Sequence, residues 1–297
     1  MVSVYRSVSV CTLLRGRQEH FDHLVAGLRA QTLAPDELVV AYMQDEPPEM
    51  SGDCAFPVRM RRVPGEPMPL AAARNAAADA ASGDVLAFLD VDCIPDKDFV
   101  RRAGEAASTD GEGVYLPEVR YLPGEPGGWL DPAARIPDYP RLERRGCRHP
   151  SKQPLAGCST SPIHDFGELW GLAFILARDT WHAAGGMDED YVGYGAEETD
   201  FGRRLRHSGA RLYWLGGTIC YHQHHHVHNP PLQHFDSILR NASLFQRKWG
   251  ERCMEYWIDD FKRRGLVERS DSELIVLRRP TSMEIAETRQ GPEVLFS

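Results

Sequence analysis

Short apolar runs separated by amphipathic stretches dominate the first hundred residues. Such runs predict buried strands at four places, namely 7–14 (SVSVCTLL), 37–43 (ELVVAYM), around 58–63, and 85–95 (VLAFLDVDCIP). The stretches between them predict two helices, one amphipathic at 16–31 and one rich in alanine at 70–83. Strands that alternate with helices predict an α/β fold with a doubly wound, mostly parallel, Rossmann-like sheet.

The rest of the chain is less regular. Residues 104–165 are loop-rich and crowded with Pro and Gly, which predicts a lid or binding loop. Periodicity then returns with a strand leading into a short helix at 167–186, a helix at 197–209, a strand pair or a strand with a turn at 211–222, and an amphipathic helix beyond Pro230. We expect one domain at 1–228, divided into halves at 1–103 and 104–228, followed by a helical extension and tail at 229–297.

Composition narrows the class of protein. Of the 297 residues 42% are hydrophobic and 26% charged, and no apolar run approaches the roughly 20 residues of a membrane span. The net charge of −9 argues against nonspecific nucleic-acid binding, which needs a basic surface. Seven cysteines without a CxxC pair indicate reduced thiols, and no signal-peptide pattern is visible. We expect a cytoplasmic protein with no membrane span and no nucleic-acid partner.

Two carboxylates stand at the end of the apolar run 85–95. An extended chain points Asp90 and Asp92 to the same face, with Val91 on the other. Ligands of open α/β sheets collect at the carboxyl ends of strands, and a cation held there by carboxylates usually bridges the phosphates of a nucleotide. The run therefore predicts a metal and nucleotide site, with an ordinary acidic turn as the alternative.

Several motifs follow one another in a particular order. These are SVSVCTLLRGR, the block LAAARNAAADAASGDVLAFLDVDCIP, a W-G pair, GGMDED, GYGAEETDFGRRL and a histidine. This combination resembles nucleotide-sugar glycosyltransferases with the A-type fold, similar to glycosyltransferase family 2, over roughly residues 7–226. The GYGAEETD block also resembles the acceptor side of galactosyltransferase-like enzymes. The resemblance implies a catalytic domain at 1–228, whose first half binds a nucleoside-diphosphate sugar and whose second half binds the acceptor.

The resemblance also implies roles for individual residues on the donor side. Asp92 matches the carboxylate that ligates Mn²⁺ or Mg²⁺, and Asp90 matches the one near the donor ribose or sugar. Arg74 and Asn75 match the ARN segment beside the donor. A bound metal can neutralise the charge that grows on the departing diphosphate.

The nucleoside pocket departs from the family pattern. Family members commonly end the second strand with an acidic residue that contacts the nucleoside, whereas here Tyr42 and Met43 hold that register and Asp45 comes later. Thr12 and Arg17, after the first strand, are expected to line the same pocket, with Asp45 as the acidic candidate. The nucleoside therefore stays open, and a UDP-sugar is the simplest choice.

Inverting transfer needs a base that takes the proton of the acceptor hydroxyl. Glu198 matches the base, and Glu197 and Asp200 stand beside it for acceptor hydroxyls or for support of a helix end. Adjacent carboxylates repel, which raises the pKa of one of them. Trp170 and Gly171 suggest an aromatic wall for an acceptor sugar, and plain core packing of Trp170 is an equal alternative.

The tract YHQHHHVH holds five histidines. In the resembling enzymes a histidine shortly after the final core strand completes the metal site, and His222 is the first choice for that role. His224 is the second, because it lies on the same side if the chain stays extended. A zinc site made only of histidines is disfavoured, since so short a run does not impose tetrahedral geometry.

The motifs together predict a metal-dependent, inverting glycosyltransferase that uses a nucleoside-diphosphate sugar and a saccharide or small hydroxylated acceptor. A sugar-phosphate nucleotidyltransferase is one alternative, but LLRGRQEH lacks the Gly-rich phosphate loop that such an enzyme needs. A non-catalytic carbohydrate-binding protein is another, although it would not need Asp90, Asp92 and Glu198 together.

Overall fold

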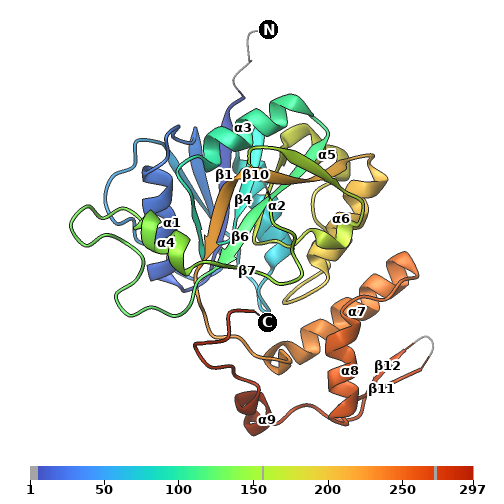
Figure 1. The fold of residues 1–297 in the computed structure, drawn as a ribbon. Coiled ribbons are helices and arrows are strands. Elements are labelled where there is room, and N and C mark those ends of the chain that lie inside the picture. Colours follow the sequence, from blue (N-terminus) through green and yellow to red (C-terminus); the bar gives the residue numbers. More distant parts are fainter. Residues whose placement is uncertain (1–5, 156, 271–272, 297) are drawn as a thin grey trace.

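A computed structural model describes residues 6–155, 157–270 and 273–296. Its main feature is a ten-stranded sheet with helices on both faces (Figure 1). The path through the sheet is β3-β2-β1-β4-β9-β6-β10-β5, with β7 paired to β6 and β8 paired to β10. The strands of this sheet are β1 (Val8–Leu14), β2 (Glu37–Tyr42), β3 (Val58–Arg62), β4 (Val85–Leu89), β5 (Cys93–Pro95), β6 (Gly113–Tyr121), β7 (Cys147–Arg148), β8 (Thr160–Ile163), β9 (Ala173–Ala177) and β10 (Arg211–His222).

Helices surround the sheet and continue beyond it. Those of the described residues are α1 (Gln18–Arg29), α2 (Leu70–Ala80), α3 (Phe99–Thr109), α4 (Tyr139–Arg145), α5 (Arg178–Ala184), α6 (Glu197–His207), α7 (Phe235–Trp249), α8 (Glu255–Arg263) and α9 (Ser282–Glu287), with single 3₁₀ turns at Phe166–Glu168 and Leu232–His234. Strands β1 to β4 are mutually parallel, whereas β9 runs antiparallel to both β4 and β6, and β10 runs parallel to β6. This mixed, mostly parallel α/β sheet confirms the predicted fold class.

Apolar side chains cover both faces of the sheet. Phe21 of α1 and Phe99 of α3 belong to the core on one face, and Trp181 of α5 and Phe201 of α6 belong to the core on the other. Helix α2 lies on that second face, where Ala71, Ala73, Ala77 and Ala78 are buried. Because alanine side chains are small, α2 packs close to β1 and β2 and brings Arg74 near the strand ends.

The Asp-x-Asp segment is a turn, not a continuation of β4. Strand β4 ends at Leu89, and the backbone N–H of Cys93 donates to the carbonyl of Asp90 at 2.9 Å. The chain then forms β5, which pairs antiparallel with β10. The prediction that strand alternation aims Asp90 and Asp92 to one face is therefore wrong, and the turn directs the two carboxylates to different neighbours.

Strand β6 lies within the stretch that the sequence pattern predicts as loop, so that prediction is wrong for 113–121. Its nine residues pair with β9 and β10 inside the sheet, and Tyr115 and Leu116 are buried. The segment 211–222 is one 12-residue strand, β10, and its pairing with β6 shifts register between Leu215 and Ile219. A continuous strand with an irregularity replaces the expected strand pair or turn.

The C-terminal extension forms a second lobe beside the lower end of the sheet in Figure 1. Helices α7 and α8 share a core that includes Phe235, Phe245 and Phe261, and a hairpin of β11 (Val267–Arg269) and β12 (Leu274–Val276) follows. The chain then returns toward the sheet, where the N–H of Gln290 donates to the carbonyl of Val227. None of the described helices has the length and the hydrophobicity that a membrane crossing needs.

Candidate active site

Three potential metal ligands, Asp92, His222 and His225, meet near the ends of β4, β5 and β10, and we call them the metal-ligand group. Asp92 lies in the turn after β4, and the antiparallel register pairs His222 with Cys93, the next residue. Nε2 of His222 lies 3.4 Å from Oδ1 of Asp92, and Nε2 of His225 lies 3.6 Å from Oδ2. One ligand atom of each residue lies within 4.8 Å of the others.

The carboxylate of Asp92 is suited to hold a cation. It is buried, its Oδ1 has no hydrogen-bond partner, and its Oδ2 contacts the guanidinium of Arg17. Burial by itself raises the pKa of Asp92, but His222, Arg17 and His225 hold that pKa below its usual value. Burial lowers the pKa of His222, which favours the neutral imidazole that binds metals. One carboxylate and two imidazoles are a donor set that fits a divalent transition metal such as Mn²⁺.

His224 does not join the metal-ligand group, contrary to the expectation for an extended chain. The chain leaves the sheet after His222. Oε1 of the buried Gln223 side chain then forms a hydrogen bond with Nδ1 of His23 at 2.5 Å. The His224 ring packs instead against His226, with ring centroids 6.0 Å apart. Since strand alternation ends with the strand, His225 rather than His224 faces Asp92.

A second cluster surrounds Arg74, and we call Arg74, Asp90, Glu197 and Glu198 the Arg74 cluster. The buried guanidinium of Arg74 reaches Oε1 of Glu198 at 3.0 Å, Oδ1 of Asp90 at 3.4 Å and Oε1 of Glu197 at 3.9 Å. Gly171 makes this approach possible, because a Cβ there would lie 1.8 Å from Oε1 of Glu198. The cluster therefore joins α2, the turn after β4 and the start of α6 around one cation.

Glu197 and Glu198 open α6 but differ in environment. The Glu197 side chain is only 6% exposed, whereas that of Glu198 is 29% exposed. Burial, together with the charge of Glu198, raises the pKa of Glu197 to about 7, against the lowering effect of Arg74. Glu198 is thus the carboxylate of the pair that a molecule from solvent can reach.

The sequence predicts Asp200 beside the base, either to bind acceptor hydroxyls or to support a helix end. The structure buries Asp200 between α6 and α7. It is fully buried, and its Oδ1 accepts hydrogen bonds from the Tyr191 hydroxyl at 3.2 Å and from Nε1 of Trp249 at 2.7 Å. Nζ of Lys248 lies 2.7 Å from the same oxygen. Asp200 therefore ties α6 to the end of α7 and is not open to an acceptor.

Asn75 was expected beside the donor, but it holds a loop of its own chain. Its Nδ2 donates to the carbonyl of Met187 at 2.9 Å and to Oε1 of Glu189 at 2.8 Å, and its Oδ1 accepts from the N–H of Met187 at 2.9 Å. All of these contacts lie in the GGMDED segment. Asn75 thus positions the loop that leads toward α6, and both hydrogens of its Nδ2 are already used within the chain.

The other expected donor residues lie around the end of the parallel half of the sheet. The hydroxyl of Thr12 is buried in β1 and has no hydrogen-bond partner. Arg17 precedes α1 with a left-handed backbone (φ 55°) and contacts Asp92. Asp45, beyond β2, is 93% exposed and pairs with Arg62 at 2.6 Å. Arg17 thus lies at the metal-ligand group, whereas Asp45 lies on the open surface.

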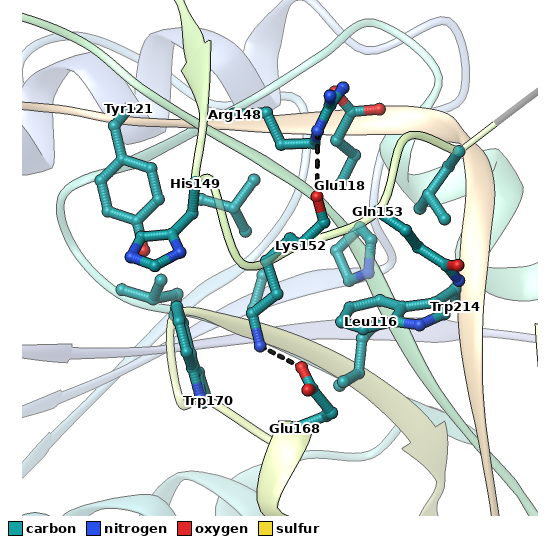
Figure 2. Close-up of a pocket in the computed structure, with 15 residues that line it drawn as sticks. Leu116, Glu118, Tyr121, Arg148, His149, Lys152, Gln153, Glu168, Trp170 and Trp214 are labelled. Carbon is teal, nitrogen blue, oxygen red and sulfur yellow. Dashed lines mark hydrogen bonds and ion pairs between the residues drawn. The ribbon is translucent and has the colours of Figure 1, made fainter. Parts of the chain in front are cut away.

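A pocket opens beside Trp170 (Figure 2). Figure 2 shows Lys152 directed at Glu168 and placed between the indole rings of Trp170 and Trp214. Nζ of Lys152 lies 3.4 Å from the ring centroid of Trp170 and 5.3 Å from that of Trp214. His149 packs edge-on against Trp170, with centroids 5.1 Å apart. Trp170 is therefore a wall of this pocket and not a core residue.

The sequence pattern does not predict His225 as a metal ligand, and of the residues that line the pocket it predicts only Trp170. Lys152, Glu168 and Trp214 come from separate segments, so no local motif joins them. Tyr121 lines the pocket and also packs on His222, with ring centroids 5.0 Å apart. His225 belongs to the histidine tract after β10. The density of histidines in that tract indicates a metal site, but their spacing does not show which of them bind the metal.

Two known proteins are similar to this chain in sequence. The protein named succinoglycan biosynthesis protein ExoM, from Rhizobium meliloti, is 27% identical over an alignment 242 positions long, which covers 77% of this chain and 67% of that protein. Validoxylamine A glucosyltransferase, from Streptomyces hygroscopicus subsp. limoneus, is 27% identical over an alignment 265 positions long, which covers 81% of this chain and 56% of that protein. The chain thus spans between half and two thirds of the length of these relatives.

Solved structures show the same fold. TarS from S. aureus superposes with a TM-score of 0.51 at 13% identity, over 88% of this chain and 43% of that chain. Its segment 1–349 gives a TM-score of 0.50 at 12% identity, over 93% of this chain and 97% of that segment.

Family models cover both halves of the sheet. Residues 158–228 match the model described as the N-terminal domain of galactosyltransferase. The model of glycosyl transferase family 2 matches residues 9–160, slightly more than half of the chain. These residues include β1, the Asp-x-Asp turn and the Arg74 helix, and the protein is therefore a member of glycosyl transferase family 2.

Proposed function

We propose that the protein is a metal-dependent, inverting glycosyltransferase. It moves a sugar from a nucleoside-diphosphate sugar, most simply a UDP-sugar, to a hydroxyl of a saccharide or small-molecule acceptor. The observation that carries the proposal is the position of the metal-ligand group next to the Arg74 cluster, since Asp92 and Asp90 belong to the same turn. Family membership and a relative named as a glucosyltransferase support sugar transfer as the reaction.

On the donor side, Asp92, His222 and His225 would hold Mn²⁺. Their two imidazoles suit a transition metal better than Mg²⁺, which prefers oxygen ligands. The bound metal would supply positive charge to the diphosphate that leaves. Arg17 contributes a second cation at the same carboxylate, and the Asp90 carboxylate, 31% exposed beside Arg74, would accept hydrogen bonds from the hydroxyls of the donor sugar or ribose. The unpartnered hydroxyl of Thr12 lies in β1, the strand that leads into the Arg17 loop, where we place the nucleoside.

On the acceptor side, Glu198 accepts the proton. The acceptor oxygen forms a bond to the anomeric carbon, the bond from that carbon to the diphosphate oxygen breaks, and the acceptor proton passes to the Glu198 carboxylate. Arg74 holds that carboxylate at 3.0 Å and Gly171 leaves room for it. A direct displacement of this kind inverts the configuration of the anomeric carbon, because the nucleophile enters opposite the leaving group.

Donor turnover tests the class of reaction. The protein is incubated with UDP-, GDP-, dTDP- and ADP-sugars, in Mn²⁺ and in EDTA, and the released nucleoside diphosphate is measured. The proposal predicts release from one of these donors in Mn²⁺ and none in EDTA. A nucleotidyltransferase would instead make a nucleotide sugar from a sugar phosphate, and a binding protein would bind the donor without turnover.

The pair Glu198→Gln and Glu197→Gln tests the base. Glutamine keeps the shape of glutamate but accepts no proton, so Glu198→Gln should lose about 10²-fold or more in turnover, the usual scale of general-base catalysis. Glu197→Gln is the matched control. Its side chain is buried and out of reach of the acceptor, contrary to the expectation that it serves acceptor hydroxyls, so it should lose much less turnover than Glu198→Gln. Near-normal turnover in Glu198→Gln, or a product that retains the configuration of the donor, would remove Glu198 as the base of a direct displacement.

A further inference from the structure

Four aromatic rings follow one another between the loop before α6 and the C-terminal lobe, and we call His234, Tyr194, Trp257 and Tyr256 the aromatic row. The ring centroids of His234 and Tyr194 lie 4.6 Å apart. Those of Tyr194 and Trp257 lie 5.5 Å apart, and those of Trp257 and Tyr256 lie 4.8 Å apart. Because Trp257 and Tyr256 belong to the first turn of α8, the row joins the sheet to the lobe below it in Figure 1.

The protein covers the aromatic row only in part. Tyr256 is 62% exposed, and the other three residues are half-buried. Tyr194 and Trp257 pack against the apolar core that α7 and α8 share, which holds their rings from one side. Within the described part of the chain, neither tyrosine hydroxyl of the row nor Nε1 of Trp257 has a hydrogen-bond partner. The row therefore offers anchored rings with free polar edges to a molecule from solvent.

The aromatic row lies beside the proposed base. Tyr194 precedes Glu198 by four residues, and Nδ2 of Asn241 in α7 holds the loop between them by donating to the carbonyl of Gly195 at 2.8 Å. Helix α8 packs on the same loop, because a Cβ at Gly195 would lie 2.5 Å from Sδ of Met254, the residue before α8. Burial raises the pKa of Tyr194, and Glu198 adds more to the rise than any other charge. The phenol of Tyr194 is thus close to the exposed carboxylate of the Arg74 cluster.

The charges around the aromatic row disfavour an anionic ligand. The carboxyls of Glu197 and Asp90 act on Tyr194 in the same direction as that of Glu198. Burial, together with the charge of His228, lowers the pKa of His234, so this ring is uncharged at neutral pH. A carboxylate or phosphate bound here would meet like charges and no cation of the row. A ligand without acidic groups avoids that repulsion.

A pyranose ring has the chemistry that such a row recognises. One face of the ring carries C–H groups, which bury apolar surface against an indole or a phenol. The partial positive charge of these C–H groups also faces the electron-rich face of the aromatic ring. Hydroxyls at the edge of the pyranose can then bond the tyrosine hydroxyls and Nε1 of Trp257. A small acyclic metabolite presents no comparable face.

We infer that the aromatic row is an acceptor subsite, which binds a pyranose ring of a saccharide without acidic groups. The sugar ring packs on Trp257 and Tyr256, and a hydroxyl of the saccharide reaches Glu198 past Tyr194. This inference rests on the proposed function, because it takes Glu198 as the base. It narrows the acceptor from any hydroxylated small molecule to a saccharide, and it assigns the C-terminal lobe to acceptor binding.

Binding is measured without catalysis, by saturation-transfer NMR, which detects millimolar affinities and reports which sugar protons contact the protein. The probes are the methyl glycosides of glucose, galactose and mannose, with the methyl glycosides of glucuronate and galacturonate as acidic counterparts. They are titrated into the wild type, Tyr256→Ala, Trp257→Ala and Met283→Ala. Tyr256 is exposed, so its replacement spares the core. Met283→Ala is the matched control, because Met283 is a 72% exposed apolar side chain of the same lobe outside the row.

We expect at least one neutral glycoside to bind the wild type, with saturation transfer to its ring C–H protons, and its acidic counterpart to bind more weakly. Tyr256→Ala and Trp257→Ala should each weaken this binding by about fivefold or more, because the contact between sugar and aromatic ring is lost. Met283→Ala should bind like the wild type. No binding of any neutral glycoside, tighter binding of the acidic ones, or equal affinities of Tyr256→Ala and Met283→Ala would overturn the inference.

The donor assay separates this failure from failure of the proposed function. If donor turnover depends on Mn²⁺ but Tyr256→Ala and Trp257→Ala bind neutral glycosides like the wild type, the subsite is wrong and the glycosyltransferase proposal stands. If no donor is turned over, both fail, because the row then serves no acceptor. With an active donor, Tyr256→Ala should raise KM for a saccharide acceptor by about fivefold or more and lower kcat less, since the row binds the acceptor without touching the reacting atoms.

Discussion

Asp90 and Asp92 are separated by one residue but differ in their electrostatic surroundings. Arg17, His222 and His225 surround Asp92 and hold its pKa below the usual value although it is buried. Burial raises the pKa of Asp90, and the nearby charge of Asp92 adds to the rise while Arg74 opposes it. Asp92 therefore stays ionised and suits a metal, whereas Asp90 suits hydrogen bonds to an uncharged hydroxyl.

The histidine tract gives a prediction on single ligands. His222→Ala and His225→Ala should each weaken Mn²⁺ binding by about 100-fold or more, because changing only an outer-shell partner of a metal ligand already costs roughly 10–100-fold. His224→Ala is the matched control and should bind Mn²⁺ like the wild type, since its ring faces His226. Calorimetric titration with Mn²⁺ measures the three affinities. A loss in His224→Ala that equals the loss in His225→Ala would contradict the geometry.

Glu197 gives a prediction on pH. Its pKa is raised to about 7 in the folded protein, above the value of about 4.5 in an unfolded chain, so the folded state binds the extra proton between these values. Glu197 therefore favours folding fully below pH about 4.5, and that contribution is lost as the pH rises to about 7. Glu197→Gln should remove a slope of at most about 1.4 kcal/mol per pH unit from the free energy of unfolding in this range. Urea unfolding from pH 5 to 8 measures it, and identical pH profiles of variant and wild type would contradict the raised pKa.

Motif spacing in the sequence identified residues that the structure brings together, but not their contacts. Asp92 meets His222 because both lie beside strand ends, and Arg74 of α2 meets Glu198 at the start of α6. Asn75 could not be placed in the same way, since its partner Met187 lies 112 residues away and belongs to a loop. Residue type and spacing predict the edge of the sheet that a side chain reaches, and tertiary packing decides what it touches there.

At the scale of elements, the strands with uniform apolar runs were the predictable ones. Strand β6 carries Pro117 and Glu118 in mid-strand, so neither a period of two nor an apolar run marks it, and its place between β9 and β10 decides its conformation. The sequence pattern also predicts the end of β4 too late, because it does not register the turn after Leu89. The alternating pattern continues through Asp90–Val91–Asp92, but the hydrogen bond from Cys93 to Asp90 closes a turn there.

Helix α6 depends on α7 through Asp200. Asp200→Asn should lower the free energy of unfolding by about 1–3 kcal/mol, because the buried bonds to Trp249 and Tyr191 lose a charged acceptor and Lys248 loses its buried counter-ion. Asp236→Asn is the control, since its pair with Arg279 is 63% and 71% exposed and should contribute less than about 1 kcal/mol. Urea unfolding measures both. Equal losses in the two variants would show that Asp200 does not link the lobes.

At the scale of the whole molecule, the fold places one functional cluster on each side of the Asp-x-Asp turn. The pairing of β5 with β10 brings the histidine tract to Asp92, and the start of α6 brings Glu198 to Arg74. In the proposed function, the parallel half of the sheet supplies the donor side. The antiparallel insertion of β9 next to β4 places Trp170 and Gly171, which precede β9, on the proposed acceptor side.

The central claim is that the metal-ligand group binds the cation on which the nucleotide depends. Calorimetry of UDP binding to the wild type and to Asp92→Asn, in Mn²⁺ and in EDTA, tests it most directly, because asparagine removes the negative charge at nearly constant volume. We predict that the wild type binds UDP tightly in Mn²⁺ and weakly in EDTA, and that Asp92→Asn binds it weakly in both. Equal UDP affinity of the wild type in Mn²⁺ and in EDTA, or unchanged Mn²⁺-dependent affinity in Asp92→Asn, would contradict the account.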